Sequence, residues 1–225
     1  MYVISQLFIY PVKSLGGFEI ASAKLTDKGF EYDRRWMIVD SDNNFLTQRE
    51  YPEMCLLQTA IDNKLLIIFA KNNNADCISV PLQNLPAPTI KVKIWDDVCT
   101  AQYVSDDADK WLSAKLVMPC RLVFMPDTER RKVDDRYALN NEVTNFSDGY
   151  PLMIIGQASL DELNGRLTEP LPTDRFRPNI VLAGGNAFDE DTMENVQASA
   201  ARATTSGEMP GRRMSSDSAP LDLTA

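Results

Sequence analysis

Short segments typical of β-strands dominate the first 104 residues of this 225-residue chain. Residues 3–10, 36–39, 65–70 and 90–95 are rich in Val, Ile, Leu, Phe and Trp, side chains that suit a half-buried sheet. Turn-forming residues separate such segments, as at residues 41–44, Ser-Asp-Asn-Asn, and no helical spacing lies between them. We therefore expect an antiparallel barrel or sandwich in this half of the chain.

Helical patterns begin only at Ser105. Ser105 is a favoured N-cap residue, two aspartates follow it, and apolar residues recur on one face as far as Leu116. A second helix is predicted at Ser159-Leu160-Asp161-Glu162, a capping box with Ser159 as N-cap. Further strands are expected at residues 121–125, 152–155 and 180–183. The predicted fold class is mainly β with a few helices.

Composition excludes several classes of function. The chain contains no histidine, which excludes Ser-His-Asp and Cys-His catalysis and His-ligated metals. A formal net charge of -9 argues against nucleic-acid partners and anionic membranes. The cysteines form no C-x-x-C pair, so zinc and iron–sulfur sites are not expected, and we predict buried, reduced thiols at Cys55, Cys77, Cys99 and Cys120. The N-terminus lacks signal-peptide character, and the expected localisation is cytoplasmic.

A lysine close to a strand-ending proline and to two glycines is the first candidate site. Lys13 and Ser14 follow Pro11, which ends a strand, and Gly16 and Gly17 come shortly after. An ammonium, a hydroxyl and accessible backbone amides together suit a phosphate or carboxylate. The alternative interpretation is a solvated lysine in a turn.

Arginines supply further candidates. In Asp33-Arg34-Arg35, side chains alternate, so only one arginine can face a pocket; a surface pair with Asp33 is the alternative. If residues 174–179 are extended, Arg175 and Arg177 share a face, where an anion would relieve their repulsion. Acids from elsewhere in the chain could pair with them instead.

Two polar segments complete the candidates. Asn179 offers a donor and an acceptor to the edge of a heterocycle. Ser147 and Asp148 lie in a turn that, taken alone, indicates nothing more than a turn.

Six motifs in order carry a family resemblance. They are Y-P-V-K-S at 10–14, D-R-R-W at 33–36, F-L-T-Q-R-E at 45–50, F-S-D-G-Y-P-L-M-I-I at 146–155, S-L-D-E-L-N at 159–164 and R-F-R-P-N-I-V at 175–181. Over roughly residues 1–193 the chain resembles MOSC proteins with an N-terminal β-barrel domain. This family includes the mitochondrial amidoxime-reducing component and, more distantly, the C-terminal domain of molybdenum cofactor sulfurase.

The resemblance implies a β-barrel domain at residues 1–120 and a partial, barrel-like MOSC domain at 121–195, with the molybdenum cofactor between them. It implies reduction of N-hydroxylated small molecules at molybdenum, with electrons from a partner redox protein. The matching positions that would bind the pterin and its phosphate are Lys13, Ser14, Arg34, Ser147, Asp148, Arg177 and Asn179.

One departure from the family pattern concerns the metal. The family continues past an acidic stretch, matched here by residues 188–194, to a P-C-x-R-C-like segment whose cysteine ligates molybdenum. Here no cysteine follows Cys120. We therefore expect impaired activity and uncertain cofactor retention, a disordered tail at 196–225, and a truncated or frame-shifted chain. Alternatives are a non-enzymatic carrier of this or another phosphorylated cofactor and, less favoured, a pyridoxal-phosphate role, for which no lysine of low pKa is identified in the sequence.

Overall fold

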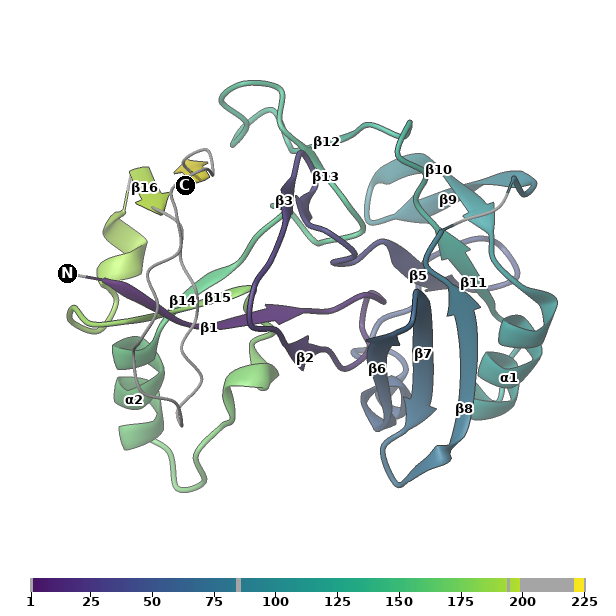
Figure 1. Cartoon of the computed structure of the whole chain (residues 1–225), viewed down its shortest axis with the longest axis horizontal. Coiled ribbons are helices and arrows are strands. Elements are labelled where there is room, and N and C mark those ends of the chain that lie inside the picture. The colour runs from purple at the N-terminus through teal and green to yellow at the C-terminus, as the bar shows by residue number, and fades with distance from the viewer. Residues whose placement is uncertain (1, 84–85, 194, 199–220, 225) are drawn as a thin grey trace. The chain divides into compact units, whose positions relative to one another are not determined.

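The computed structural model describes residues 2–83, 86–193, 195–198 and 221–224 (Figure 1). Strands predominate in them, and two α-helices are present, which confirms the mainly-β prediction. The chain divides into two compact units. The terminal unit comprises residues 1–8, 19–25 and 152–225, and the central unit comprises residues 9–18 and 26–151.

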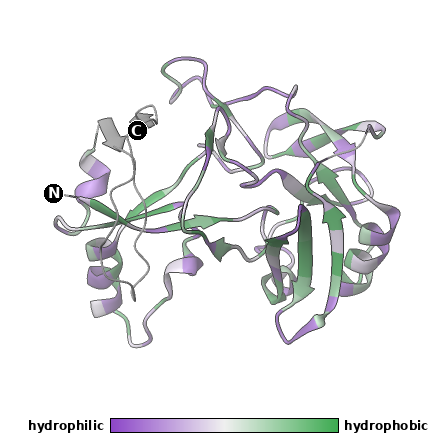
Figure 2. Cartoon of the chain, in the orientation of Figure 1, coloured by the Kyte–Doolittle hydropathy of each residue, from purple (hydrophilic) through white to green (hydrophobic). Residues whose placement is uncertain are grey.

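The central unit contains two larger antiparallel sheets. One consists of β6 (Leu57–Asp62), β7 (Leu65–Ala70) and β8 (Asn73–Pro81). The other has the order β5-β11-β10-β9, from β5 (Trp36–Val39), β11 (Arg121–Phe124), β10 (Asp97–Tyr103) and β9 (Thr89–Ile94). Strand β7 is hydrophobic along its length (Figure 2), as expected for a central strand. Asn63 and Lys64, both at positive φ, form the two-residue turn between β6 and β7.

Helix α1 (Asp106–Leu116) follows the sequence prediction. The Ser105 side chain accepts a hydrogen bond from the Ala108 backbone N–H, so Ser105 is the N-cap. Ala108, Leu112 and Leu116 are buried in a cluster that includes Trp36 and side chains of the β6-β7-β8 sheet. The amphipathic face of α1 therefore closes one side of the core of the central unit.

The terminal unit is organised around a sheet of order β14-β15-β1-β2. These strands are β14 (Ile154–Gly156), β15 (Ile180–Ala183), β1 (Val3–Ile9) and β2 (Phe18–Glu19). Strand β15 pairs in parallel with β14 and antiparallel with β1. Helix α2 (Gln157–Gly165) lies in the connection between the two parallel strands.

The predicted N-cap of α2 is wrong. The N-cap is Gly156, and Ser159 lies within the first turn, where its hydroxyl donates to Glu190. The helix begins earlier than predicted because Glu190 also accepts the Gly156 backbone N–H at 2.8 Å. A distant carboxylate thus supplies the acceptor that the capping box was expected to provide.

Short elements complete the described structure. They are β3 (Leu25–Thr26), β4 (Gly29–Phe30), β12 (Arg131–Lys132), β13 (Val143–Thr144) and the 3₁₀ turns η1 (Pro52–Leu56), η2 (Thr173–Arg175) and η3 (Asp189–Thr192). Residues 46–49 form no strand, and Phe45 makes only an isolated bridge to Val39.

None of the helices in the described residues has the length and apolar character needed to cross a membrane.

Part of the predicted tail is described. Strand β16 (Asn195–Ala198) pairs antiparallel with β17 (Leu221–Thr224), at positions where the sequence predicts no regular structure. Residues 199–220 of the expected disordered segment lie outside the described residues.

Candidate anion-binding site

Three backbone segments of the central unit lie side by side at the candidate site. The Arg34 N–H donates to the Tyr10 carbonyl at 2.8 Å, and the Lys13 N–H donates to the Trp36 carbonyl at 2.8 Å. The Phe146 N–H donates to the Arg34 carbonyl at 3.0 Å. These hydrogen bonds bring the motifs that contain Lys13, Arg34 and Ser147, far apart in sequence, into one region.

Asp33 fixes this arrangement from within. Its side chain is fully buried; one carboxylate oxygen accepts the Tyr10 N–H at 2.8 Å and the other pairs with the Arg34 guanidinium at 2.5 Å. Arg35 instead donates to Asp127 and to the Met125 carbonyl. The Asp33 pair is therefore buried, unlike the surface pair of the alternative interpretation. The two arginines have different partners, but not through strand alternation, because Arg34 has φ of 46° and precedes β5.

Lys13 is a buried cation. Its side chain is 7% exposed, and Nζ lies 2.6 Å from Asp148 Oδ1. The ring centroids of Phe45 and Trp95 lie 5.4 and 5.8 Å from Nζ. Burial lowers the pKa of Lys13 to about 8; the charge of Asp148 opposes that shift, and the nearby arginines reinforce it. An additional anion near Nζ would stabilise the charged form.

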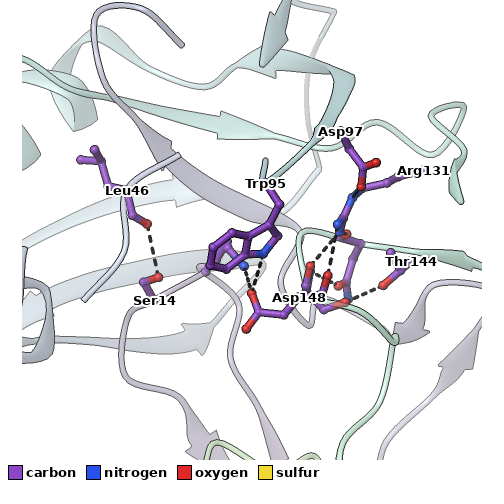
Figure 3. Close-up of polar contacts among 10 residues, drawn as sticks. Ser14, Leu46, Trp95, Asp97, Arg131, Thr144 and Asp148 are labelled. Atoms are coloured by element: carbon purple, nitrogen blue, oxygen red, sulfur yellow. Dashed lines mark hydrogen bonds and ion pairs between the residues drawn. The ribbon is translucent and has the colours of Figure 1, made fainter. Parts of the chain in front are cut away.

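Asp148 receives two donors on one oxygen. Oδ1 accepts from Lys13 Nζ and, at 3.1 Å, from the indole N–H of Trp95 (Figure 3). Partial desolvation raises the pKa of the Asp148 carboxyl, although most of its side chain is exposed. The Lys13 charge, both hydrogen bonds and Arg34 together outweigh this effect, so the pKa lies below its usual value. Asp148 is therefore ionised at neutral pH.

Arg131, which the sequence analysis did not single out, holds the loop that carries Asp148. Its buried guanidinium pairs with Asp97 at 2.7 Å. It also donates to the carbonyls of Asn145 at 2.9 Å, Ser147 at 2.7 Å and Asp148 at 3.2 Å (Figure 3). Because three of its partners are backbone carbonyls, no local residue pattern indicates this role.

Hydrogen bonds within the loop fix Ser147. The buried Asn145 amide donates to the Asp33 carbonyl at 2.7 Å, while its oxygen accepts the Ser147 N–H at 2.8 Å. The Ser147 hydroxyl is buried against the Thr144 hydroxyl at 2.5 Å. In this structure the Ser147 side chain shapes the loop.

Ser14 and Arg34 adopt left-handed backbone conformations, with φ of 67° and 46°. The conformation costs about 1–2 kcal/mol per non-glycine residue, so surrounding contacts must impose it. Gln48 donates to the Ser14 carbonyl at 2.6 Å, and the Ser14 hydroxyl donates to the Leu46 carbonyl at 3.3 Å.

Arg177 and Asn179 belong to the terminal unit and are described there by themselves. The condition under which Arg175 and Arg177 would share a face is not met: residues 174–179 are not extended, because the chain turns through η2 and Arg177 has φ of 58°. The fully buried Asn179 amide accepts the Met153 N–H at 3.1 Å and donates to the Phe8 carbonyl at 3.3 Å. Asn179 therefore ties β1 to the start of β14.

The thiols have the character of ordinary cysteines. Cys99 and Cys120 are buried, and burial raises the pKa of both, that of Cys99 to about 11. Protonated thiols are poor metal ligands, because the thiolate is the ligating form. All four thiols are free, but Cys55 and Cys77 are exposed, so their predicted burial is wrong. The described residues contain no cluster of three or more Cys, Asp or Glu side chains suited to a metal.

Two family models match the sequence. The MOSC N-terminal beta barrel domain matches residues 1–119, more than half of the chain, and the MOSC domain matches residues 141–216. The chain therefore belongs to the family of MOSC proteins that carry this N-terminal domain.

Its relatives fall into two groups. Mouse mitochondrial amidoxime-reducing component 1 is 29% identical over 203 residues, which are 86% of this chain and 59% of the relative. The rat mitochondrial amidoxime reducing component 2 is 30% identical, over 86% of this chain and 60% of the relative. The rice molybdenum cofactor sulfurase is 30% identical over 221 residues, 91% of this chain and 27% of the relative. The chain thus spans about three fifths of the first group's length and about a quarter of the sulfurase.

Solved structures match as well. One of them, the solution structure of a Bordetella bronchiseptica protein, covers 53% of this chain and 89% of its own, with 16% identity and a TM-score of 0.43.

Proposed function

We propose that this chain binds the molybdenum cofactor through the anion-binding site of the central unit. The observation that carries the proposal is the buried ammonium of Lys13, close to the Arg34 guanidinium, which influences its pKa. Arg34 is paired with the buried Asp33, whereas Lys13 is paired with the largely exposed Asp148, so Lys13 is suited to receive a specific anion. Both residues lie in the motifs that the family resemblance singles out.

The residues present fit the phosphate and pterin parts of that cofactor. Lys13 and Arg34 would neutralise the phosphate. Once released from Lys13, the Asp148 carboxylate would be an acceptor for N–H groups of a heterocycle. On the resemblance, Ser14 and Ser147 would belong to this site, and Arg177 and Asn179 of the terminal unit would also bind the cofactor. The hydrogen bonds of Ser147 and Asn179 favour a role in positioning the backbone.

When bound, the cofactor would supply the redox chemistry at molybdenum. The proposed reaction is reduction of N-hydroxylated small molecules, with electrons from a redox protein, which the names of the amidoxime-reducing relatives support. The chain's own residues would hold the cofactor and exclude water from the buried Lys13.

A carrier is the second candidate function. Residues 141–216, matched to the MOSC domain, contain no cysteine, so this segment supplies no thiolate to the metal. A chain that binds the cofactor without a protein thiolate would hold or deliver it without turnover.

A pyridoxal-phosphate role meets one chemical requirement in this structure and fails another. Lys13 has the lowered pKa that a Schiff-base lysine needs, contrary to the sequence analysis. With a pKa of about 8, however, the amine stays mostly protonated at neutral pH, and Asp148 stabilises that charged form rather than the neutral nucleophile. We therefore do not propose this role.

The test is cofactor loading of the purified chain. We expect molybdenum and pterin to copurify or reconstitute with the wild type and to fall at least ten-fold in Lys13→Met. The matched control Lys93→Met removes an exposed lysine of β9 and should load normally. Equal loading of all three would overturn the proposal. Turnover of an aryl amidoxime with a chemical reductant by the loaded chain separates a reductase from a carrier.

A further inference from the structure

We propose that the Asp148 carboxylate occupies the place of an anion in this site, and that Lys13 Nζ and Trp95 Nε1 form the donor pair that an incoming phosphate takes over when the Asp148 side chain turns away. The inference rests on the proposed function and adds Trp95 to the site as a binding residue. It also gives Asp148 a role opposite to that of a phosphate ligand: it competes with the phosphate.

Convergence of two donors on one oxygen is the first observation. Lys13 Nζ lies 2.6 Å and Trp95 Nε1 lies 3.1 Å from the same atom, Asp148 Oδ1 (Figure 3). Ammonium and indole N–H groups are donors only, so this pair can be satisfied by an anion or another acceptor but not by a cation.

Exposure distinguishes the fixed partner from the movable one. The Lys13 side chain is 7% exposed, whereas the Asp148 side chain is 71% exposed. The cation is therefore confined by its surroundings, while the carboxylate can turn into solvent and be hydrated there. Because the carboxylate is already largely hydrated, its release from the ion pair costs less free energy than the release of a buried carboxylate would.

The loop allows this movement without unfolding. Arg131 holds the carbonyls of Ser147 and Asp148, so the backbone is fixed and only the Asp148 side chain has to rotate. The neighbouring Gly149 has open space where a Cβ would stand.

Trp95 is placed by a turn that favours this contact. It lies between β9 and β10 with φ of 52°, a conformation uncommon for a bulky residue. Its ring packs edge-to-face on Phe45 with centroids 4.7 Å apart, and the Arg49 guanidinium lies 5.7 Å from its centroid. The indole is therefore held over Lys13 with its N–H directed at Asp148.

The experiment measures sulfate binding by isothermal titration calorimetry at pH 6, where sulfate keeps a constant charge and Lys13 is protonated. We expect Asp148→Asn to bind sulfate at least five-fold more tightly than the wild type, because a competing charge is removed. In the Asp148→Asn background, Trp95→Phe keeps the ring but loses the donor and should weaken binding at least three-fold. Asp127→Asn, which removes the exposed partner of Arg35, is the matched control and should change nothing.

The outcomes separate this inference from the proposed function. If Asp148→Asn and Asp148→Ser bind sulfate no more tightly than the wild type while Lys13→Met abolishes binding, Asp148 does not compete; the inference fails and the proposed function stands. If Lys13→Met binds as well as its parent in both backgrounds, the anion lies elsewhere and both fail. Absence of binding by every variant also overturns the inference.

Discussion

Lys13 and Asp148 form an ion pair at 2.6 Å although 135 positions separate them in the sequence. The pair joins the segment after β1 to the loop before β14, and both of its residues belong to the central unit. Its cation is buried and its anion is exposed, and this asymmetry underlies the predictions for the site.

The lowered pKa of Lys13 makes stability depend on pH. Between about 8, its pKa in the folded protein, and 10.5, its ordinary pKa, the unfolded chain binds more protons at this lysine than the folded one. Stability from this group therefore rises as pH rises through that window and is lowest below it. Urea unfolding gives the free energy of unfolding of the wild type and of Lys13→Met at pH 7 and at pH 10. From pH 7 to pH 10, the difference between the two proteins should shift by about 2–3 kcal/mol in favour of the wild type. The same difference for Lys93→Met should stay constant, and a constant difference for Lys13→Met would contradict the burial of Lys13.

Arg131 should contribute strongly to stability. Arg131→Met removes the partner of Asp97 and of three backbone carbonyls, and loss of one partner from such a buried network costs about 3–5 kcal/mol. The neighbouring Arg130, a 60% exposed partner of Asp27, is the control, and Arg130→Met should cost about 1 kcal/mol or less. Equal denaturation midpoints for the two variants would show that the guanidinium does not hold the loop.

Val117 ends α1 under strain. It is 88% exposed with φ of 54°, in the left-handed region that β-branched residues rarely adopt. Val117→Gly should raise the free energy of unfolding by about 1 kcal/mol. Val98→Gly makes the same change at an exposed position of strand β10 and should lower stability by about 1 kcal/mol. Thermal unfolding of both variants checks the opposite signs.

Asn179 should contribute to the stability of the fold even when no ligand is bound. Asn179→Ala leaves the Met153 N–H and the Phe8 carbonyl without their side-chain partner in a fully buried position. We expect a loss of about 2–3 kcal/mol, measured by urea unfolding without cofactor. Asn186→Ala, at an exposed position of the same unit, should cost about 0.5 kcal/mol or less. If Asn179→Ala is as stable as the control, the amide is available for the cofactor.

The sequence predicts correctly those strands and helix ends that are determined by neighbouring residues. The apolar runs of β5 and β15 and the Ser105 cap of α1 lie where the sequence predicts them, because propensity, capping and periodicity agree there. The α2 N-cap was predicted wrongly because its acceptor, Glu190, comes 34 residues after Gly156.

The candidate site was only partly predictable for the same reason. Motifs pointed to Lys13, Arg34 and Asp148, and the structure brings these together. Trp95 and Arg131 were missed, since an indole N–H on a distant carboxylate and a guanidinium on backbone carbonyls leave no spacing in the sequence. The left-handed φ of Arg34, a residue without glycine's freedom, is likewise imposed by the buried Asp33 and its hydrogen bonds.

The most direct test of the account is a crystal structure of this chain loaded with molybdenum cofactor. The account predicts a phosphate oxygen within about 3 Å of Lys13 Nζ, the Arg34 guanidinium beside the phosphate, and the Asp148 side chain turned away from Lys13. A cofactor bound elsewhere, with the Lys13–Asp148 ion pair intact, would contradict it.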